Sequence, residues 1–251
     1  MVDQKVFKID NTFLDGAQNS KVVLLILNRP IHRPLFDQFI ALSPEIICAD
    51  GGANRLYDLL EDSEDRQKFL PSAVIGDLDS LRKEVRDHYH KQKVEIQDLS
   101  HDQDTTDFEK CFNHLISKEA FSDDMTRFLV LGAFGGRLDH TMRNISYLLS
   151  LPENIKAYFL DEYSMGFRVP KGKTEIKFSK KFEFTKGCGI IPAQTTRIST
   201  NGLKWNLGQA PWDVTSLDTQ ISTSNERVSN EVTIECDRDI VWMSSLNFLN
   251  E

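Results

Sequence analysis

Aspartates recur in this sequence directly after short apolar runs. They occur in Asp50-Gly51-Gly52, in Gly76-Asp77-Leu78-Asp79-Ser80 and repeatedly between Asp98 and Asp107. Carboxylate oxygens are the ligands that Mg²⁺ prefers, and an Asp-x-Asp pair in one loop can supply two of them. A bound divalent cation attracts polyphosphates even in an acidic protein. These residues therefore suggest metal-assisted chemistry on a phosphate-containing group.

The aspartates also have a structural interpretation. Asp77 and Asp79 suit a turn and the cap of a helix near Leu81, a role that single aspartates often play. The same pattern after several successive strands favours a site over turns alone.

A glycine-rich segment, residues 132–139, carries a cation of interest. Its glycines let the backbone approach phosphates closely, and a helical pattern follows. The planar guanidinium of Arg137 can bind a phosphate in two places and stabilise charge that develops during transfer. Asp139 either orients Arg137, contacts the substrate or caps the helix.

The segment 101–109 predicts a helix start. Thr106 and Glu109 match a capping box, so we expect a helix to begin at Thr106. Because a helix N-terminus presents free amides and a partial positive charge, it suits phosphate oxygens. Asp107 in the first turn can bind metal, and Gln103 and Thr106 can hydrogen-bond a nucleotide.

The elements that must position these residues form an α/β pattern up to about residue 160. Short apolar runs predict strands over 22–27, 45–49, 73–75, 93–96, 127–131 and 156–160. Helical patterns fall between them over 34–42, 54–60, 81–91, 107–118 and 138–150. A mostly parallel sheet with flanking helices binds ligands beyond the carboxyl ends of its strands, where the aspartates lie. In the last helix we expect one face to pack on the sheet, made of Leu138, Met142, Ile145, Leu148 and Leu149.

The pattern changes after Tyr163. Alternating segments separated by Gly, Asn and Lys turns cover 174–178, 182–184, 197–199 and 231–235, which is typical of an antiparallel β-sandwich. We therefore expect an α/β domain over residues 1–163 and a C-terminal β-sandwich domain over residues 164–251.

Composition excludes several classes of protein. The 251 residues carry a formal net charge of −8, which argues against a nucleic-acid surface. No apolar run is long enough for a signal or a membrane span, so we expect neither export nor a membrane partner. The four cysteines lie far apart and are expected as buried thiols in a reducing compartment, which indicates a cytoplasmic protein.

Taken together, these motifs resemble those of the eukaryotic thiamin pyrophosphokinase family, in the same order. The resemblance rests on Asp50-Gly51-Gly52-Ala53-Asn54, Gly76 to Ser80, Asp102 to Phe108 and Gly135 to His140. It extends to Gly202-Leu203-Lys204-Trp205-Asn206-Leu207 and Ser222-Thr223-Ser224-Asn225 in the second half. The stretch from Gly208 to Thr219 is longer than the family leads us to expect.

The resemblance implies an activity and an assembly. The expected enzyme transfers a diphosphate group from ATP to the hydroxyl of thiamin, which gives thiamin diphosphate and AMP, and depends on Mg²⁺. The expected assembly is a homodimer with active sites at the subunit interface, an α/β domain that binds the nucleotide and a sandwich domain that binds thiamin.

The resemblance also implies residue roles. The expected metal ligands are Asp77, Asp79 and Asp107, supported by Asp50; with Arg137, the first three are the expected catalytic residues. ATP is expected to contact Asp50, Gln103, Thr106, Gly136, Arg137 and Asp139. Thiamin is expected to contact Trp205, Ser222 and Asn225, although Trp205 is equally compatible with a place in the core.

Two other functions remain open at this stage. A metal-dependent nucleotide hydrolase would use the same carboxylates to position water. A non-catalytic nucleotide or vitamin sensor would bind Mg²⁺-ATP without turnover.

Overall fold

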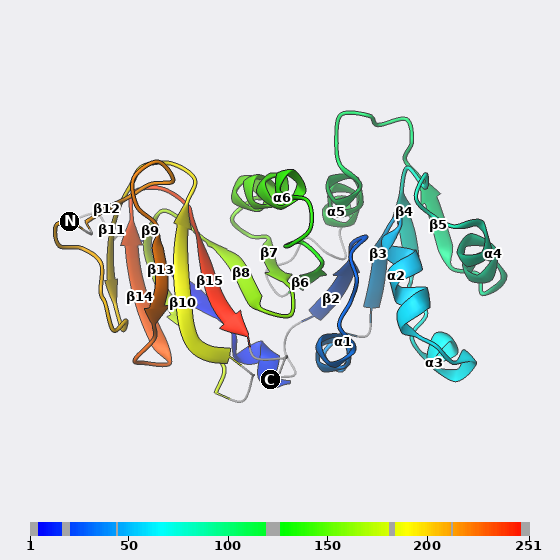
Figure 1. Ribbon diagram of the computed structural model, residues 1–251, viewed down its shortest axis with the longest axis horizontal. Coiled ribbons are helices and arrows are strands. Elements are labelled where there is room, and N and C mark those ends of the chain that lie inside the picture. The colour runs from blue at the N-terminus through cyan, green and yellow to red at the C-terminus, as the bar shows by residue number, and fades with distance from the viewer. Residues whose placement is uncertain are drawn as a thin grey trace. The chain divides into compact units, whose positions relative to one another are not determined.

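The computed structural model describes residues 5–16, 21–43, 45–118, 126–180, 184–211 and 213–246. The chain divides into two compact units, drawn in Figure 1. The first, here called the α/β unit, comprises residues 21–147 and 154–161. The second, the β unit, comprises residues 1–20, 148–153 and 162–251.

The α/β unit contains a parallel sheet with the strand order β7-β6-β2-β3-β4-β5. The chain runs outward from β2 to β5 and then returns to place β6 on the other side of β2. The carboxyl ends of β2 and β6 therefore form the topological switch point, where open sheets bind ligands. The strands are β2 (Lys21–Ile26), β3 (Glu45–Ala49), β4 (Ala73–Gly76), β5 (Glu95–Asp98), β6 (Thr126–Leu131) and β7 (Lys156–Leu160).

Helices flank this sheet, with α5 and α1 on opposite sides of it in Figure 1. The helices are α1 (Arg33–Ile40), α2 (Gly52–Leu59), α3 (Ser63–Lys68), α4 (Lys83–Lys91), α5 (Asp107–Ser117) and α6 (Leu138–Ser150). Every predicted helix is present, whereas α3 was not predicted. Because α3 buries none of its residues, it leaves no apolar period in the sequence; it is capped instead by Asp62, whose side chain accepts a hydrogen bond from the Asp65 amide.

The predicted inward face of α6 was correct at Leu148 and wrong at Leu138 and Met142. Leu138 is 72% exposed and Met142 is 45% exposed, whereas Asn144 and Leu148 are buried. The Asn144 amide donates a hydrogen bond of 2.8 Å to the carbonyl oxygen of Ala133. This bond turns a polar position of the helix inward, whereas Leu138 and Met142, at the start of the predicted stripe, face outward.

An aromatic cluster fixes α5 on the sheet. Phe112 is fully buried and its ring centroid lies 4.7 Å from that of Phe128 in β6. Phe108, one turn earlier, lies 5.4 Å from Phe159 in β7. Since Asp107 precedes Phe108, this packing also sets the position of the helix N-terminus.

The β unit has two groups of paired strands. One has the order β1-β9-β14-β11-β12 and the other β13-β10-β15-β8. Described pairs are antiparallel except β1 with β9, which is parallel and was not expected. The strands are β1 (Val6–Asp10), β8 (Ser164–Val169), β9 (Gly172–Lys177), β10 (Phe184–Pro192), β11 (Thr196–Asn201), β12 (Val214–Thr215), β13 (Ser222–Glu226), β14 (Glu231–Cys236) and β15 (Ile240–Leu246), with a 3-10 turn at Thr12–Asp15.

A buried aromatic pair joins the two groups of strands in the β unit. The rings of Phe178, which follows β9, and Trp242, in β15, lie 5.5 Å apart. This contact gives the sandwich core that the sequence predicted. Of the predicted strand 182–184, residues 182 and 183 lie outside the described residues.

All four cysteines are buried and free, as predicted. Among the described residues, no helix is long and apolar enough to cross a membrane.

The buried position of α5 generates a prediction on stability. Phe112→Ala removes a fully buried ring and should lower the free energy of unfolding by about 3–5 kcal/mol. Met142→Ala, at an exposed position of α6, is the control and should change it by less than about 0.5 kcal/mol. Thermal and denaturant unfolding measure both variants. Equal losses in the two would contradict this role for Phe112.

Candidate active site

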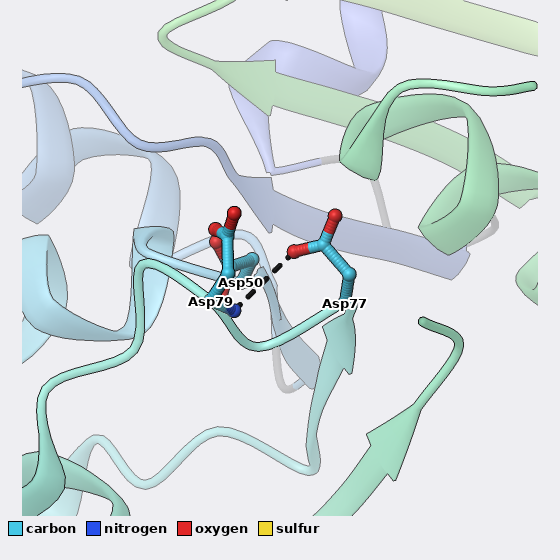
Figure 2. A group of neighbouring side chains, drawn as sticks. All are labelled: Asp50, Asp77 and Asp79. Carbon is cyan, nitrogen blue, oxygen red and sulfur yellow. Dashed lines mark hydrogen bonds between the residues drawn. The ribbon is translucent and has the colours of Figure 1, made fainter. Parts of the chain in front are cut away.

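Three carboxylates gather at the ends of neighbouring strands. Asp50 follows β3, and Asp77 and Asp79 follow β4. One carboxylate oxygen of each lies within 4.8 Å of the others. Figure 2 shows the three side chains together, with a dashed hydrogen bond of 3.3 Å from the Asp79 amide to Asp77 Oδ1. We call Asp50, Asp77 and Asp79 the acidic cluster.

The backbone around the cluster is strained. Asp50 has φ of 42° and Leu78 has φ of 63°, values that residues other than glycine rarely adopt. Gly76 allows the close approach of the two strand ends, because a Cβ there would lie 2.7 Å from Asp50 Cβ. Strain of this kind persists where the surrounding structure enforces it, and it often marks functional sites.

Asp50 is the buried member of the cluster. It is 1% exposed, and its Oδ2 accepts a hydrogen bond of 3.2 Å from the Ser80 amide. Its Oδ1 has no hydrogen-bond partner among the described residues. Burial, reinforced by the charge of Asp107, raises the pKa of Asp50 to about 6. A buried carboxylate oxygen without a donor, beside two further carboxylates, fits a hard divalent cation.

Lys110 is a site residue that the sequence reasoning missed. It is 5% exposed, and its Nζ lies 3.1 Å from Asp77 Oδ2 and 3.6 Å from Asp107 Oδ1. The signal was its spacing of three residues from Asp107, which places both on one side of α5. A buried ammonium group is tolerable only when it is paired, so Lys110 depends on its ion pairs with the two aspartates.

The two partners of Lys110 have pKa values shifted in opposite directions. Burial alone would raise the pKa of Asp77, but hydrogen bonds from Lys110 and from the Asp79 amide outweigh burial and lower it. Burial and the charge of Asp77 raise the pKa of Asp107. Asp107 also accepts a hydrogen bond of 3.4 Å from the Asp77 amide, which links α5 to the loop after β4.

The N-terminus of α5 has the predicted capping box. The Thr106 amide donates to Glu109 Oε2 at 2.9 Å, and the Glu109 amide donates to Thr106 Oγ1 at 3.3 Å. Since the hydroxyl only accepts in this box, its own hydrogen remains available for a ligand. Gln103 is exposed and donates a hydrogen bond of 2.6 Å to the carbonyl oxygen of Ser100.

A cavity of about 400 Å³ is lined by four of the nine residues predicted to bind metal or ATP. Predicted residues in its lining are Asp77, Thr106, Asp107 and Arg137, whereas Asp50, Asp79, Gln103, Gly136 and Asp139 lie outside the lining. Other lining residues come from the ends of β2 and β6, namely Asn28, Arg29, Gly132 and Gly135. The cavity therefore extends from the N-terminus of α5 to the topological switch point.

Arg137 is held by Asp139. Arg137 Nε lies 3.1 Å from Asp139 Oδ1 and Nη2 lies 2.5 Å from Oδ2, with both side chains exposed. The hydrogen bond from Arg137 lowers the pKa of Asp139 to about 2. This contact agrees with one of the roles that the sequence left open for Asp139, the orientation of Arg137.

In the β unit, Trp205 is 55% exposed, so its interpretation as a core residue was wrong. Lys204 Nζ lies 4.8 Å from its ring centroid. The loop is held by buried Asn225, whose Oδ1 accepts from the Trp205 amide at 3.3 Å and whose Nδ2 donates to the Trp205 carbonyl oxygen at 2.8 Å. Asn225 Nδ2 also lies 3.4 Å from Oγ of Ser222, which is buried. Asn225 therefore presents the Trp205 ring to solvent.

Comparison with known proteins gives matches over most of the chain. The family model described as "Thiamin pyrophosphokinase, catalytic domain" matches residues 36–159, and "Thiamin pyrophosphokinase, vitamin B1 binding domain" matches residues 173–241. Thiamine pyrophosphokinase 1 of Oryza sativa subsp. japonica is 38% identical over 92% of this chain and 89% of its own. Thiamine pyrophosphokinase of Saccharomyces cerevisiae is 34% identical over 85% of this chain and 81% of its own. The crystal structure of yeast thiamin pyrophosphokinase has a TM-score of 0.81 and 30% identity, covering 99% of this chain and 96% of that chain.

The burial of Asp50 generates a prediction on pH and stability. Its pKa in the folded protein, about 6, exceeds that of an unfolded aspartate, so its ionisation destabilises the fold as pH rises through this range. In buffer with EDTA, Asp50→Asn should therefore raise the free energy of unfolding at about pH 8 by up to about 3 kcal/mol, which is measured as a higher Tm. At about pH 4 the substitution should change Tm little.

Two controls accompany this measurement. Asp98→Asn changes an exposed carboxylate outside the cluster whose pKa is lowered, so it should bring no gain in stability at high pH. Mg²⁺ should raise the Tm of the wild type more than that of Asp50→Asn, because a cation that binds the folded state stabilises it. A gain for Asp50→Asn that does not depend on pH would show that charge is not its cause.

Proposed function

This chain belongs to the thiamin pyrophosphokinase family, and we propose that its acidic cluster performs the family's reaction with Mg²⁺-ATP. The enzyme transfers a diphosphate group from ATP to the hydroxyl of thiamin, which gives thiamin diphosphate and AMP. The observation that carries this proposal is the gathering of Asp50, Asp77 and Asp79 beside a cavity at the carboxyl ends of a parallel sheet.

The reaction breaks one bond and forms one. The hydroxyethyl oxygen of thiamin attacks the β-phosphorus of ATP, and the bond from that phosphorus to the oxygen bridging the α-phosphate breaks. AMP leaves with the bridging oxygen, and an aspartate accepts the hydroxyl proton. Such a transfer requires in-line positioning and neutralised charge more than covalent chemistry from the protein.

The carboxylates would hold the cation. Asp77, Asp79 and Asp107 are the proposed ligands, and Asp50 supports them with the oxygen that lacks a donor. When bound, Mg²⁺ neutralises the charge on the phosphate oxygens. Lys110 pairs with both Asp77 and Asp107 and thereby restrains the two side chains.

Other residues of the α/β unit bind the nucleotide. The Thr106 hydroxyl and the Gln103 amide are proposed hydrogen-bond partners of ATP, and the Gly136 backbone approaches its phosphates. Arg137, oriented by Asp139, stabilises the charge that develops during transfer.

The β unit supplies the proposed thiamin site. The exposed Trp205 ring suits stacking on an aromatic ring of thiamin, and Asn225 holds the Trp205 backbone. Ser222 and Asn225 are the other proposed thiamin contacts. We propose that the nucleotide-binding residues lie within residues 1–163 and the thiamin-binding residues within residues 164–251. We also propose a cytoplasmic homodimer, with thiamin held between the α/β domain of one subunit and the sandwich domain of the other.

The assay that tests this function incubates the protein with thiamin, ATP and Mg²⁺ and identifies the products. We expect thiamin diphosphate and AMP in equal amounts. ADP as the nucleotide product, ATP turnover that does not depend on thiamin, or no thiamin diphosphate would each contradict the proposal.

Two variants test the metal role in the same assay. Asp77→Asn and Asp79→Asn should each lower kcat by about 100-fold or more, because each replaces a charged ligand of the cation. Circular dichroism should show an unchanged fold. Asp98→Asn, an exposed carboxylate outside the cluster, should keep the wild-type rate. Retained activity in both cluster variants would refute their role.

A further inference from the structure

An arginine that the preceding roles leave unassigned stands at the topological switch point. Arg29 follows β2, whose neighbours in the sheet are β6 and β3. Its amide donates a hydrogen bond of 2.7 Å to the carbonyl oxygen of Leu27, which fixes the backbone at the strand end. The side chain lines the same cavity as Asp77, Asp107 and Arg137. Arg29 is therefore placed where open α/β sheets bind their ligands.

The guanidinium of Arg29 rests on the glycine-rich segment after β6. A Cβ at Gly136 would lie 1.8 Å from Arg29 Nη1, and a Cβ at Gly135 would lie 3.2 Å from Nη2. Nearer the backbone, a Cβ at Gly132 would lie 2.8 Å from Arg29 Cβ. Because the glycines of this segment have no side chain, the Arg29 side chain can lie directly against the loop.

Charge pairing separates Arg29 from the other cations of the cavity. The lysines and arginines of its lining are Arg29, Lys110 and Arg137. Lys110 is paired with Asp77 and Asp107, and Arg137 is paired with Asp139. In the part of the chain that the structure describes, no carboxylate forms an ion pair with Arg29. Its charge is therefore available to an anionic ligand.

We propose that Arg29 binds phosphate oxygens of the nucleoside triphosphate, from the β2 end of the cavity. The planar guanidinium can donate two parallel hydrogen bonds to one phosphate, and its fixed seat on the loop reduces the entropy lost on binding. The guanidinium of Arg29 would add to the charge neutralisation that a cation held by the aspartates would supply. This inference rests on the proposed function for the identity of the nucleotide.

The test measures nucleotide binding directly. Calorimetry with Mg²⁺ and a non-hydrolysable ATP analogue, without thiamin, compares the wild type with Arg29→Gln. The neutral variant should bind the analogue about tenfold or more weakly. In the full assay, KM for ATP should rise by a similar factor while KM for thiamin stays within about twofold. Arg29→Lys should be intermediate, since it keeps the charge but loses the planar fork.

Arg33→Gln is the matched control. Arg33 begins α1, four residues beyond Arg29, and is paired with Asp37 at 2.8 Å and Asp65 at 2.9 Å outside this cavity. Arg33→Gln removes the same charge from a nearby position. Because Arg33 does not line the cavity, this substitution should change binding of the analogue by less than about twofold.

A second pair of variants tests the seat of the guanidinium. Gly136→Ala should weaken binding of the analogue, because the added methyl group would meet Arg29 Nη1. In an Arg29→Ala background the same substitution should cost less, because the guanidinium is gone. Equal effects in the two backgrounds would contradict this seat.

The outcomes distinguish this proposal from the proposed function. Unchanged binding by a folded Arg29→Gln protein overturns the role of Arg29, even if the wild type forms thiamin diphosphate. Weakened binding by Arg29→Gln in a protein that forms no thiamin diphosphate supports Arg29 and overturns the proposed activity. A wild type that does not bind the analogue overturns both.

Discussion

Repulsion between carboxylates is the constraint on which this site depends. Asp50, Asp77 and Asp79 place oxygens within 4.8 Å of one another in a chain of net charge −8. Lys110 relieves part of this repulsion by pairing with Asp77 and Asp107. Burial and the charge of Asp107 still raise the pKa of Asp50 to about 6, and one of its oxygens has no donor among the described residues. A divalent cation would remove both penalties, so the site is costly for the fold and suited to a metal.

The fold maintains this arrangement from both sides of the cluster. Parallel strands bring their carboxyl ends to one edge, and Gly76 lets the end of β4 approach Asp50. Burial of Phe108 and Phe112 fixes α5, which delivers Asp107 and Lys110 together. The switch point between β2 and β6 supplies positive charge from Arg29 and Arg137 to the same cavity. The carboxylates, which suit a metal ion, thus follow β3 and β4, whereas the arginines, which suit phosphate oxygens, follow β2 and β6.

The sequence predicted the features that local chemistry determines. Apolar runs located the parallel strands, and the capping box located the start of α5 at Thr106. Features set by tertiary contacts could not be predicted in this way. The apolar stripe of α6 was assigned to the core, but its first members, Leu138 and Met142, are exposed, and Asn144 is turned inward by its bond to Ala133. Lys110 was missed because its partner Asp77 lies 33 residues earlier in the chain. ATP and thiamin were predicted as substrates from the resemblance to a family and not from residue spacing.

The most direct measurement locates the cation itself. Crystals grown with Mn²⁺, thiamin and a non-hydrolysable ATP analogue give anomalous diffraction that shows the position of the metal. We predict an anomalous peak within coordination distance of Asp77 and Asp79 and in contact with phosphate oxygens of the analogue. A metal bound elsewhere, or a bound analogue with no metal at these aspartates, would contradict the assignment of the acidic cluster as the catalytic metal site.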